Sequence, residues 1–143
     1  MPTPIKEHRP TLTWRAAVAI VQGAIREAER LGVRVVVSVC DSSGTVAAQV
    51  RMPGAPFHCS GIAEDKAYTA AAFGMPTSGW TAALATLSPE VQMGLRTRPR
   101  FVTFGGGIPV RDGEDLLGGV GVSGASEEQD EQCAQAGLRA LQE

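Results

Sequence analysis

The chain has 143 residues, of which 43% are hydrophobic and 20% are charged, with a formal net charge of -2 at pH 7. This length and composition are typical of one globular domain that buries a core of its own. The small negative charge gives no electrostatic reason to expect nucleic acid or an anionic membrane as a partner. No apolar run approaches the roughly 20 residues that a membrane-spanning helix needs.

The N-terminal residues favour a cytoplasmic protein, and the cysteines favour reduced thiols. Residues 1–10, MPTPIKEHRP, lack the pattern of a signal peptide, and their prolines predict an extended arm. Residues 11–143 should form one domain. The three cysteines, at 40, 59 and 133, are odd in number and show no CxxC spacing. They therefore predict reduced thiols, with neither a disulfide framework nor a zinc site.

The N-terminal third of the domain predicts a helix followed by a β-hairpin. Thr13 is a suitable N-cap, and apolar residues then recur at helical spacing until Gly32, which can end the helix. The buried face should include Trp14. A β-branched run, a turn at residues 41–44 and a second extended run then predict a hairpin over residues 33–52.

The middle of the chain predicts three helices. A loop at residues 57–59 should lead to a helix that is capped by Ser60 and ended by Gly74. Thr77 can cap a shorter helix that reaches Leu87, and Ser88 followed by proline can start another. The basic cluster Arg96-Thr-Arg98-Pro-Arg100 indicates a solvated loop more than an anion site.

The C-terminal part predicts three strands and a last helix. A short apolar run at residues 101–104 precedes a triple-glycine bend, and Asp112-Gly113 indicates a hairpin turn before a strand that ends near Ser123. Ser126 with Gln129 is a plausible capping box for the last helix, whose buried side should extend to Leu141. With the first hairpin this gives five strands. The predicted fold is α+β, with an antiparallel sheet flanked by helices.

Glycines dominate two motifs in this C-terminal part. Gly105, Gly106 and Gly107 can form a bulge or a corner, or they can expose backbone to the polar groups of a ligand. Residues 119–124 also match the GxGxxG fingerprint of dinucleotide-binding proteins. That fingerprint requires a βαβ unit. Because only one helix-length segment follows here, the match does not indicate a dinucleotide site.

Several motifs together resemble those of the GlcG/HbpS family, in the order in which that family has them. The resemblance covers roughly residues 11–142. It is carried by KAYTA at 66–70, FGMPT at 73–77, GGIPV at 106–110, GGVGVSG at 118–124 and QD at 129–130, with Asp41, Gly44 and Leu12-Thr13 as further matches.

The resemblance implies a five-stranded, profilin-like antiparallel sheet and assembly into dimers and often octamers. The family includes haem-binding sensor proteins, the C-terminal domain of PduO-type corrinoid adenosyltransferases, and members encoded in catabolic operons. Haem binding is therefore implied as a possibility, with haem degradation in some members.

Haem requires an apolar slot and an axial ligand such as His, Cys, Met or Tyr. His8 lies on the predicted arm, so His58 is the better candidate for an iron ligand, and its neighbour Cys59 is a weaker one. A surface or hydrogen-bonded loop histidine is the alternative for His58. The acidic pairs at 64–65 and 127–128 could bind iron, although solvated helix faces are the favoured explanation for them.

Lys66 lies on the family motif and on a helical stripe with Phe73. It can extend to solvent, or it can direct its ammonium group at a carboxylate beside the glycine bend. Asp130 is already explained by its place in the first turn of a helix. The candidate cofactor-binding residues are His58, Lys66, Phe73, Gly105, Gly106 and Gly107.

Three functions remain open from the sequence. The first is a small-molecule-binding oligomeric domain, with haem as the best candidate ligand. The second is a cofactor-independent enzyme acting on a small carboxylate or carbonyl compound, with Lys66 as catalytic residue and the glycine-bend amides stabilising an oxyanion. The third is a structural subunit of a larger assembly.

Overall fold

The computed structural model describes residues 1–143, and its centre is a four-stranded antiparallel sheet with the order β2-β1-β4-β3. The two predicted hairpins supply all four strands, and β1 and β4 join them in the middle of the sheet. The strands are β1 (Val36–Asp41), β2 (Val46–Arg51), β3 (Gly107–Asp112) and β4 (Asp115–Ser123). The α+β class and the antiparallel sheet are confirmed.

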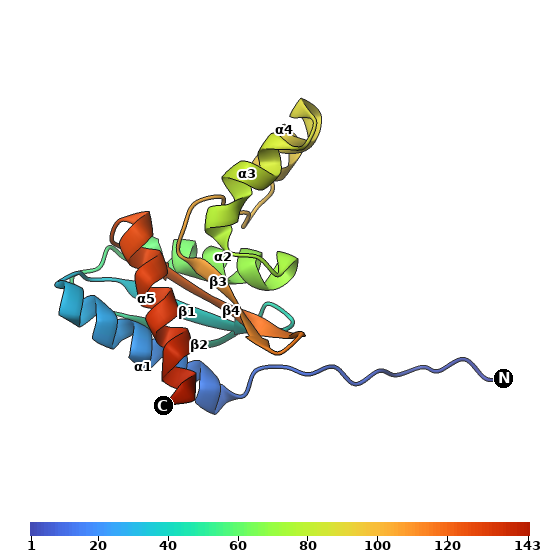
Figure 1. Cartoon of the computed structure of the whole chain (residues 1–143), viewed down its shortest axis with the longest axis horizontal. Helices are drawn as coiled ribbons and strands as arrows, with labels where there is room; N and C mark the ends of the chain where they lie inside the picture. Colours follow the sequence, from blue (N-terminus) through green and yellow to red (C-terminus); the bar gives the residue numbers. More distant parts are fainter.

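The sheet lies between helices on both faces (Figure 1). Helices α1 (Trp14–Leu31) and α5 (Glu127–Arg139) lie side by side on one face, and α2 (His58–Phe73) packs on the other against β4, β1 and β3. The main apolar core lies between the sheet and helices α1 and α5. It includes Ile20, Val37, Val120, Val122 and Cys133. Successive strand residues point to opposite faces, so the sheet packs against helices on both sides.

Glycines in β4 allow α2 to approach the sheet closely. A Cβ atom at Gly121 would lie 2.0 Å from the carbonyl oxygen of Ala63, and one at Gly119 would lie 2.3 Å from that of Ala67. These residues of the GxGxxG match are therefore a packing surface for a helix. The structure confirms that the match does not belong to a dinucleotide-binding unit, because residues 115–123 form a strand of an antiparallel sheet.

The predicted fifth strand at residues 101–104 is wrong. Its backbone bonds to a side chain of α2, since Val102 N–H donates to Thr69 Oγ1 at 3.1 Å and the Thr69 hydroxyl donates to the Arg100 carbonyl at 2.8 Å. Phe101 packs edge-on against Phe73 and Trp80, with ring centroids 5.7 and 4.8 Å apart. Aromatic packing and the Thr69 hydroxyl thus take the place of a neighbouring strand.

Most predicted helix ends are confirmed, and two are wrong. Thr13, Ser88 and the Ser126–Gln129 capping box cap α1, α4 (Pro89–Arg96) and α5 as expected. Helix α2 begins at His58, and Ser60 lies inside it. Thr77 starts a 3₁₀ turn, Thr77–Gly79, before α3 (Trp80–Ala85), because its hydroxyl is engaged by Gly107.

Two predicted buried residues are exposed, and two segments extend away from the sheet. Trp14 and Leu141 are 62% and 40% exposed because each lies at the end of its helical segment. Residues 1–10 are exposed and without regular structure, and they extend from the domain, as do α3 and α4 (Figure 1). A 3₁₀ turn, Ala140–Gln142, follows α5. No helix is both long and apolar enough to cross a membrane.

Candidate functional site

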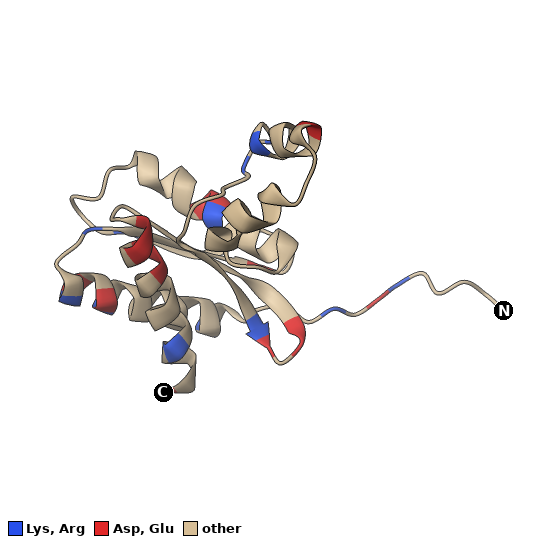
Figure 2. Ribbon diagram, turned by 45° about the horizontal axis from the view of Figure 1, so that its top comes forward, with Lys and Arg blue, Asp and Glu red and all other residues tan.

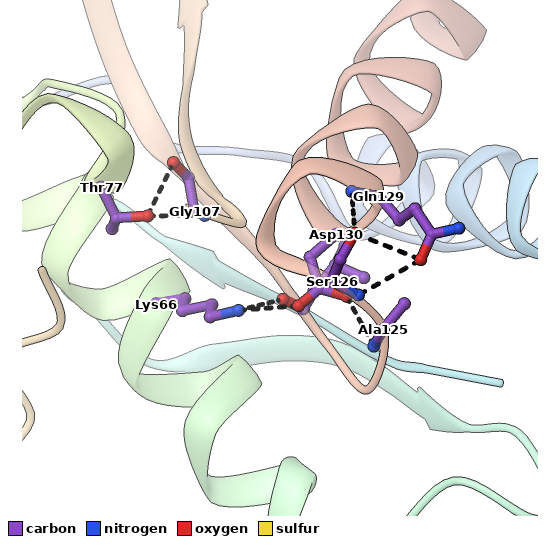
Figure 3. A network of polar contacts seen from close by, with 8 residues as sticks. Lys66, Thr77, Gly107, Ala125, Ser126, Gln129 and Asp130 are labelled. Carbon is purple, nitrogen blue, oxygen red and sulfur yellow. Dashed lines mark hydrogen bonds and ion pairs between the residues drawn. The ribbon is translucent and has the colours of Figure 1, made fainter. Parts of the chain in front are cut away.

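The side chain of Lys66 runs from α2 to the start of α5 and is only 1% exposed. Its ammonium group donates to the carbonyl of Val122 at 2.8 Å and to Asp130 Oδ2 at 3.0 Å (Figure 3). The extension of Lys66 to solvent is therefore excluded. The alternative geometry is the one observed, because the amine meets a carboxylate beside the glycine bend.

Asp130 is buried in the first turn of α5 and is held on both oxygens. Oδ2 accepts from Lys66, and Oδ1 accepts from the N–H of Ala125 at 3.0 Å (Figure 3). Burial raises the pKa of Asp130, and the attraction of Lys66 opposes this shift. The pair therefore links α2 to α5 through a buried contact between opposite charges.

The glycine bend packs directly against Lys66. Gly106 has a φ of +127°, and a Cβ atom there would lie 2.6 Å from the Val122 carbonyl oxygen and 2.7 Å from Lys66 Nζ. At Gly107 a Cβ atom would lie 2.5 Å from the Lys66 carbonyl oxygen. The Gly107 N–H donates to the Thr77 hydroxyl at 2.9 Å. The absence of side chains at Gly106 and Gly107 thus leaves the space that Lys66 occupies.

This arrangement decides what the Lys66 amine can do chemically as it stands. Two directions of the ammonium group are bonded, and the ring centroid of Phe104 lies 5.0 Å away. An ammonium ion that is buried and bonded in this way is poorly placed to bind a propionate or to form a Schiff base unless the ion pair opens. The catalytic and ligand-binding roles of Lys66 stay predictions.

The predicted cofactor-binding residues do not all meet. His58 and Phe73 are the first and last residues of α2. At 1.5 Å of rise per residue they lie about 22 Å apart along the helix. His58 is exposed at the surface, beside an exposed Phe57. The two residues thus lie at opposite ends of one helix, and their shared role in haem binding stays a prediction. The chain also holds no group of three or more His, Cys, Asp and Glu residues placed to bind a metal ion.

Phe73 instead lines a pocket of about 300 Å³ between α2 and the segment that follows α4. Aromatic rings form much of its wall, and two arginines stand beside them. The lining residues are Tyr68, Thr69, Ala72, Phe73, Leu95, Arg98, Pro99, Arg100 and Phe101.

The backbone and side chain of Arg100 are fixed at this pocket. Its φ is +66°, the only positive value outside glycine in the chain, and such a conformation is uncommon for a residue with a side chain. Its guanidinium group lies 3.7 Å from the Tyr68 ring centroid and bonds to Asp65 at 2.9 Å. Arg98 is exposed and has no carboxylate within ion-pair distance. The cluster predicted to be a solvated loop therefore forms one side of a pocket.

Sequence reasoning found Phe73 and missed the other pocket residues. The signal that could have pointed to this segment was the pair Arg98 and Arg100 directly before the aromatic Phe101. The contact with Tyr68 could not be predicted, because it depends on the path of the chain after α4.

A model of the family described as "haem degrading protein HbpS-like" matches residues 12–139, and the chain belongs to this family. The resemblance predicted from the motifs is thereby confirmed. Among curated proteins, the corrinoid adenosyltransferase PduO of Citrobacter freundii is 34% identical to this chain over 136 residues. This match covers 95% of the chain but only 41% of the length of that PduO protein.

Solved structures show the same fold. A structure of the complex of PduOC with haem superposes with a TM-score of 0.82 and 33% identity, covering 91% of the chain and 94% of that one. A double mutant of HbpS from Streptomyces reticuli superposes with a TM-score of 0.86 and 31% identity, covering 99% and 97% of the two chains.

Proposed function

We propose that this chain binds haem in the pocket that Phe73 lines. Membership of the HbpS-like family and the solved haem complex of a relative support haem as the ligand. The observation that carries the placement is the aromatic wall of the pocket next to two arginines. The site holds a flat apolar ligand that also bears negative charge.

The lining residues suit both the apolar porphyrin ring and the charged propionates of haem. Phe73 and Phe101 offer apolar surface to the porphyrin, and Phe73 is 51% exposed, so its ring is available to a ligand. Arg98 and Arg100 stand where the propionates can reach them. Arg98 carries the larger share of this role, because Asp65 already pairs with Arg100.

The pocket also contains one side chain of a type that binds haem iron, the phenol of Tyr68. His58, the ligand candidate from the sequence, lies about 15 Å from Tyr68 and about 22 Å from Phe73 along α2, as measured by helical rise. Within one chain, Tyr68 is therefore the proposed axial ligand. His58 contributes to such a site only if it comes from a neighbouring molecule.

Haemin titration of the purified protein, followed at the Soret band, tests this proposal. Phe73→Ala should weaken binding by about tenfold or more, because loss of an aromatic wall removes a large apolar contact. Tyr68→Phe should shift the position of the Soret band and leave the fold unchanged. His8→Ala, on the N-terminal arm, is the matched control and should bind as the native chain does.

His58→Ala separates the two placements of the iron. If that substitution abolishes the Soret shift while Phe73→Ala and Tyr68→Phe leave it intact, haem is held at the N-terminus of α2 and the proposed placement is wrong. If the native chain gives no shift at all, the proposed function itself is wrong.

A further inference from the structure

A hollow of about 500 Å³, here called the α1–β2 hollow, lies between the end of α1 and the edge strand β2. It shares no lining residue with the Phe73 pocket. Part of its wall is apolar, with Ile25 and Val33 on the side of α1 and Val50 and Met52 on the side of β2. Val50 is 43% exposed, so this apolar surface is open to a ligand.

Two opposite charges line the same hollow without an ion-pair partner. Glu29 is exposed near the end of α1, and its carboxylate forms no ion pair within the chain, because the neighbouring Arg30 is bonded to Glu27. Arg34 also lines the hollow, and no carboxylate lies within ion-pair distance of its guanidinium group. Figure 2 shows acidic and basic positions close together at this end of α1.

The chain holds Arg34 in place and leaves most of its donors free. Its Nη1 donates to the carbonyl of Pro53 at 2.7 Å, and a Cβ atom at Gly54 would lie 3.7 Å from its Cγ. The remaining N–H groups of the guanidinium can bond a carboxylate, the anion that best fits their planar geometry. The last carbonyls of a helix carry partial negative charge, so the end of α1 acts with Glu29 to attract a cation. The hollow therefore offers a place for each sign of charge beside an apolar wall.

We propose that the α1–β2 hollow binds a small amino acid with an apolar side chain. The ligand carboxylate bonds to Arg34, its ammonium group lies at Glu29 and the carbonyl end of α1, and its side chain packs on Ile25 and Val50. A ligand with only one charge leaves either Arg34 or Glu29 without a partner. This inference concerns a separate site and does not depend on haem binding.

Isothermal titration calorimetry of the native chain with L-leucine tests this proposal. Leucine carries both charges and an apolar side chain, whereas isocaproate lacks the ammonium group and isoamylamine lacks the carboxylate. Each analogue should bind at least about tenfold more weakly than leucine, because each loses one charge-assisted contact. Glycine should also bind about tenfold more weakly, because it leaves the apolar wall uncovered.

Two variants assign the charges to their residues. Arg34→Met keeps the apolar part of the side chain and should no longer prefer leucine to isoamylamine. Glu29→Gln should no longer prefer leucine to isocaproate, and it removes no ion pair of the folded chain. Arg26→Met is the matched control, because Arg26 lies on α1 outside the hollow and pairs with Glu143. This control should bind leucine as the native chain does.

Amide NMR spectra of the native chain locate the bound leucine. The signals of Gly32 and Val33 should shift during the titration, and that of Phe73 should not. A shift at Phe73 alone would place leucine in the other pocket and overturn the proposal. Absence of binding at millimolar leucine, or equal affinity of the native chain for leucine and either analogue, would overturn it as well. So would equal losses of leucine binding in Arg26→Met and Arg34→Met.

Discussion

The buried ion pair of Lys66 and Asp130 predicts a specific loss of stability when either partner is replaced. Replacing Lys66 by Met leaves the Asp130 carboxylate without its cation, and replacing Asp130 by Asn leaves the ammonium group without its anion. Both side chains are almost fully buried, at 1% and 4% exposure. The group left behind therefore remains out of water in each single variant.

The expected loss is large for each single substitution. Breaking one partner of a buried ion pair costs about 3–5 kcal/mol of unfolding free energy. For a domain of this size that corresponds to a fall in Tm of roughly 10–17 °C. The double variant Lys66→Met/Asp130→Leu should recover most of the loss, because it removes both charges and leaves apolar groups in their place.

Urea unfolding of the native chain, both single variants and the double variant measures these values. The pair does not hold α2 against α5 if either single variant loses less than about 1 kcal/mol. If the double variant loses as much unfolding free energy as the two single variants added together, the two groups are not coupled. That result would also contradict the reasoning.

The pH dependence of Lys66→Met gives a second readout of the same contact. The pKa of Asp130 lies above its ordinary value of 3.8 because of burial, and loss of the opposing lysine raises it further. The folded variant then holds a proton that the unfolded chain has released. Its stability should therefore be highest near pH 4 and fall as the pH rises toward 7. A loss that is the same at both pH values would contradict this assignment.

Two further predictions concern glycines and thiols. Gly121→Ala should destabilise the chain by about 3 kcal/mol or more, or prevent folding, because its Cβ atom would meet the Ala63 backbone at 2.0 Å. Gly61→Ala, with open space around its Cβ position in α2, should instead be neutral or stabilising by up to about 1 kcal/mol. In the native chain one thiol should react quickly with Ellman's reagent at pH 8, because burial raises the pKa of Cys40 and of Cys133 to about 11. The fast thiol should disappear in Cys59→Ser, and more than one fast equivalent would show that the interior opens.

Local sequence signals predicted the sheet and most helix ends. The hairpin at residues 33–52 and the capping box at Ser126 depend on neighbouring residues, so their geometry follows from short-range chemistry. The fifth strand failed because Thr69, more than thirty positions away, takes the hydrogen bonds of residues 100–102. Such a bond has no local signal.

The candidate site was predictable only where local sequence signals carried it. The sequence left two alternatives open for Lys66, and contact with a carboxylate beside the glycine bend is the one observed. Asp130 was not identified as that carboxylate, since its position at a helix start already had a simpler explanation. The separation of His58 from Phe73 followed only once His58 was found inside α2, because a preceding loop could have folded back.

Haemin affinity of Phe73→Ala, measured beside that of the Lys66→Met/Asp130→Leu variant, tests the central claim most directly. The pocket at Phe73 is proposed as the site, and neither residue of the buried ion pair lines it. The first variant should bind haemin at least about tenfold more weakly, and the second should bind it as the native chain does. The opposite pattern, with full binding by Phe73→Ala and loss in the folded double variant, would place the ligand at Lys66 and contradict the account.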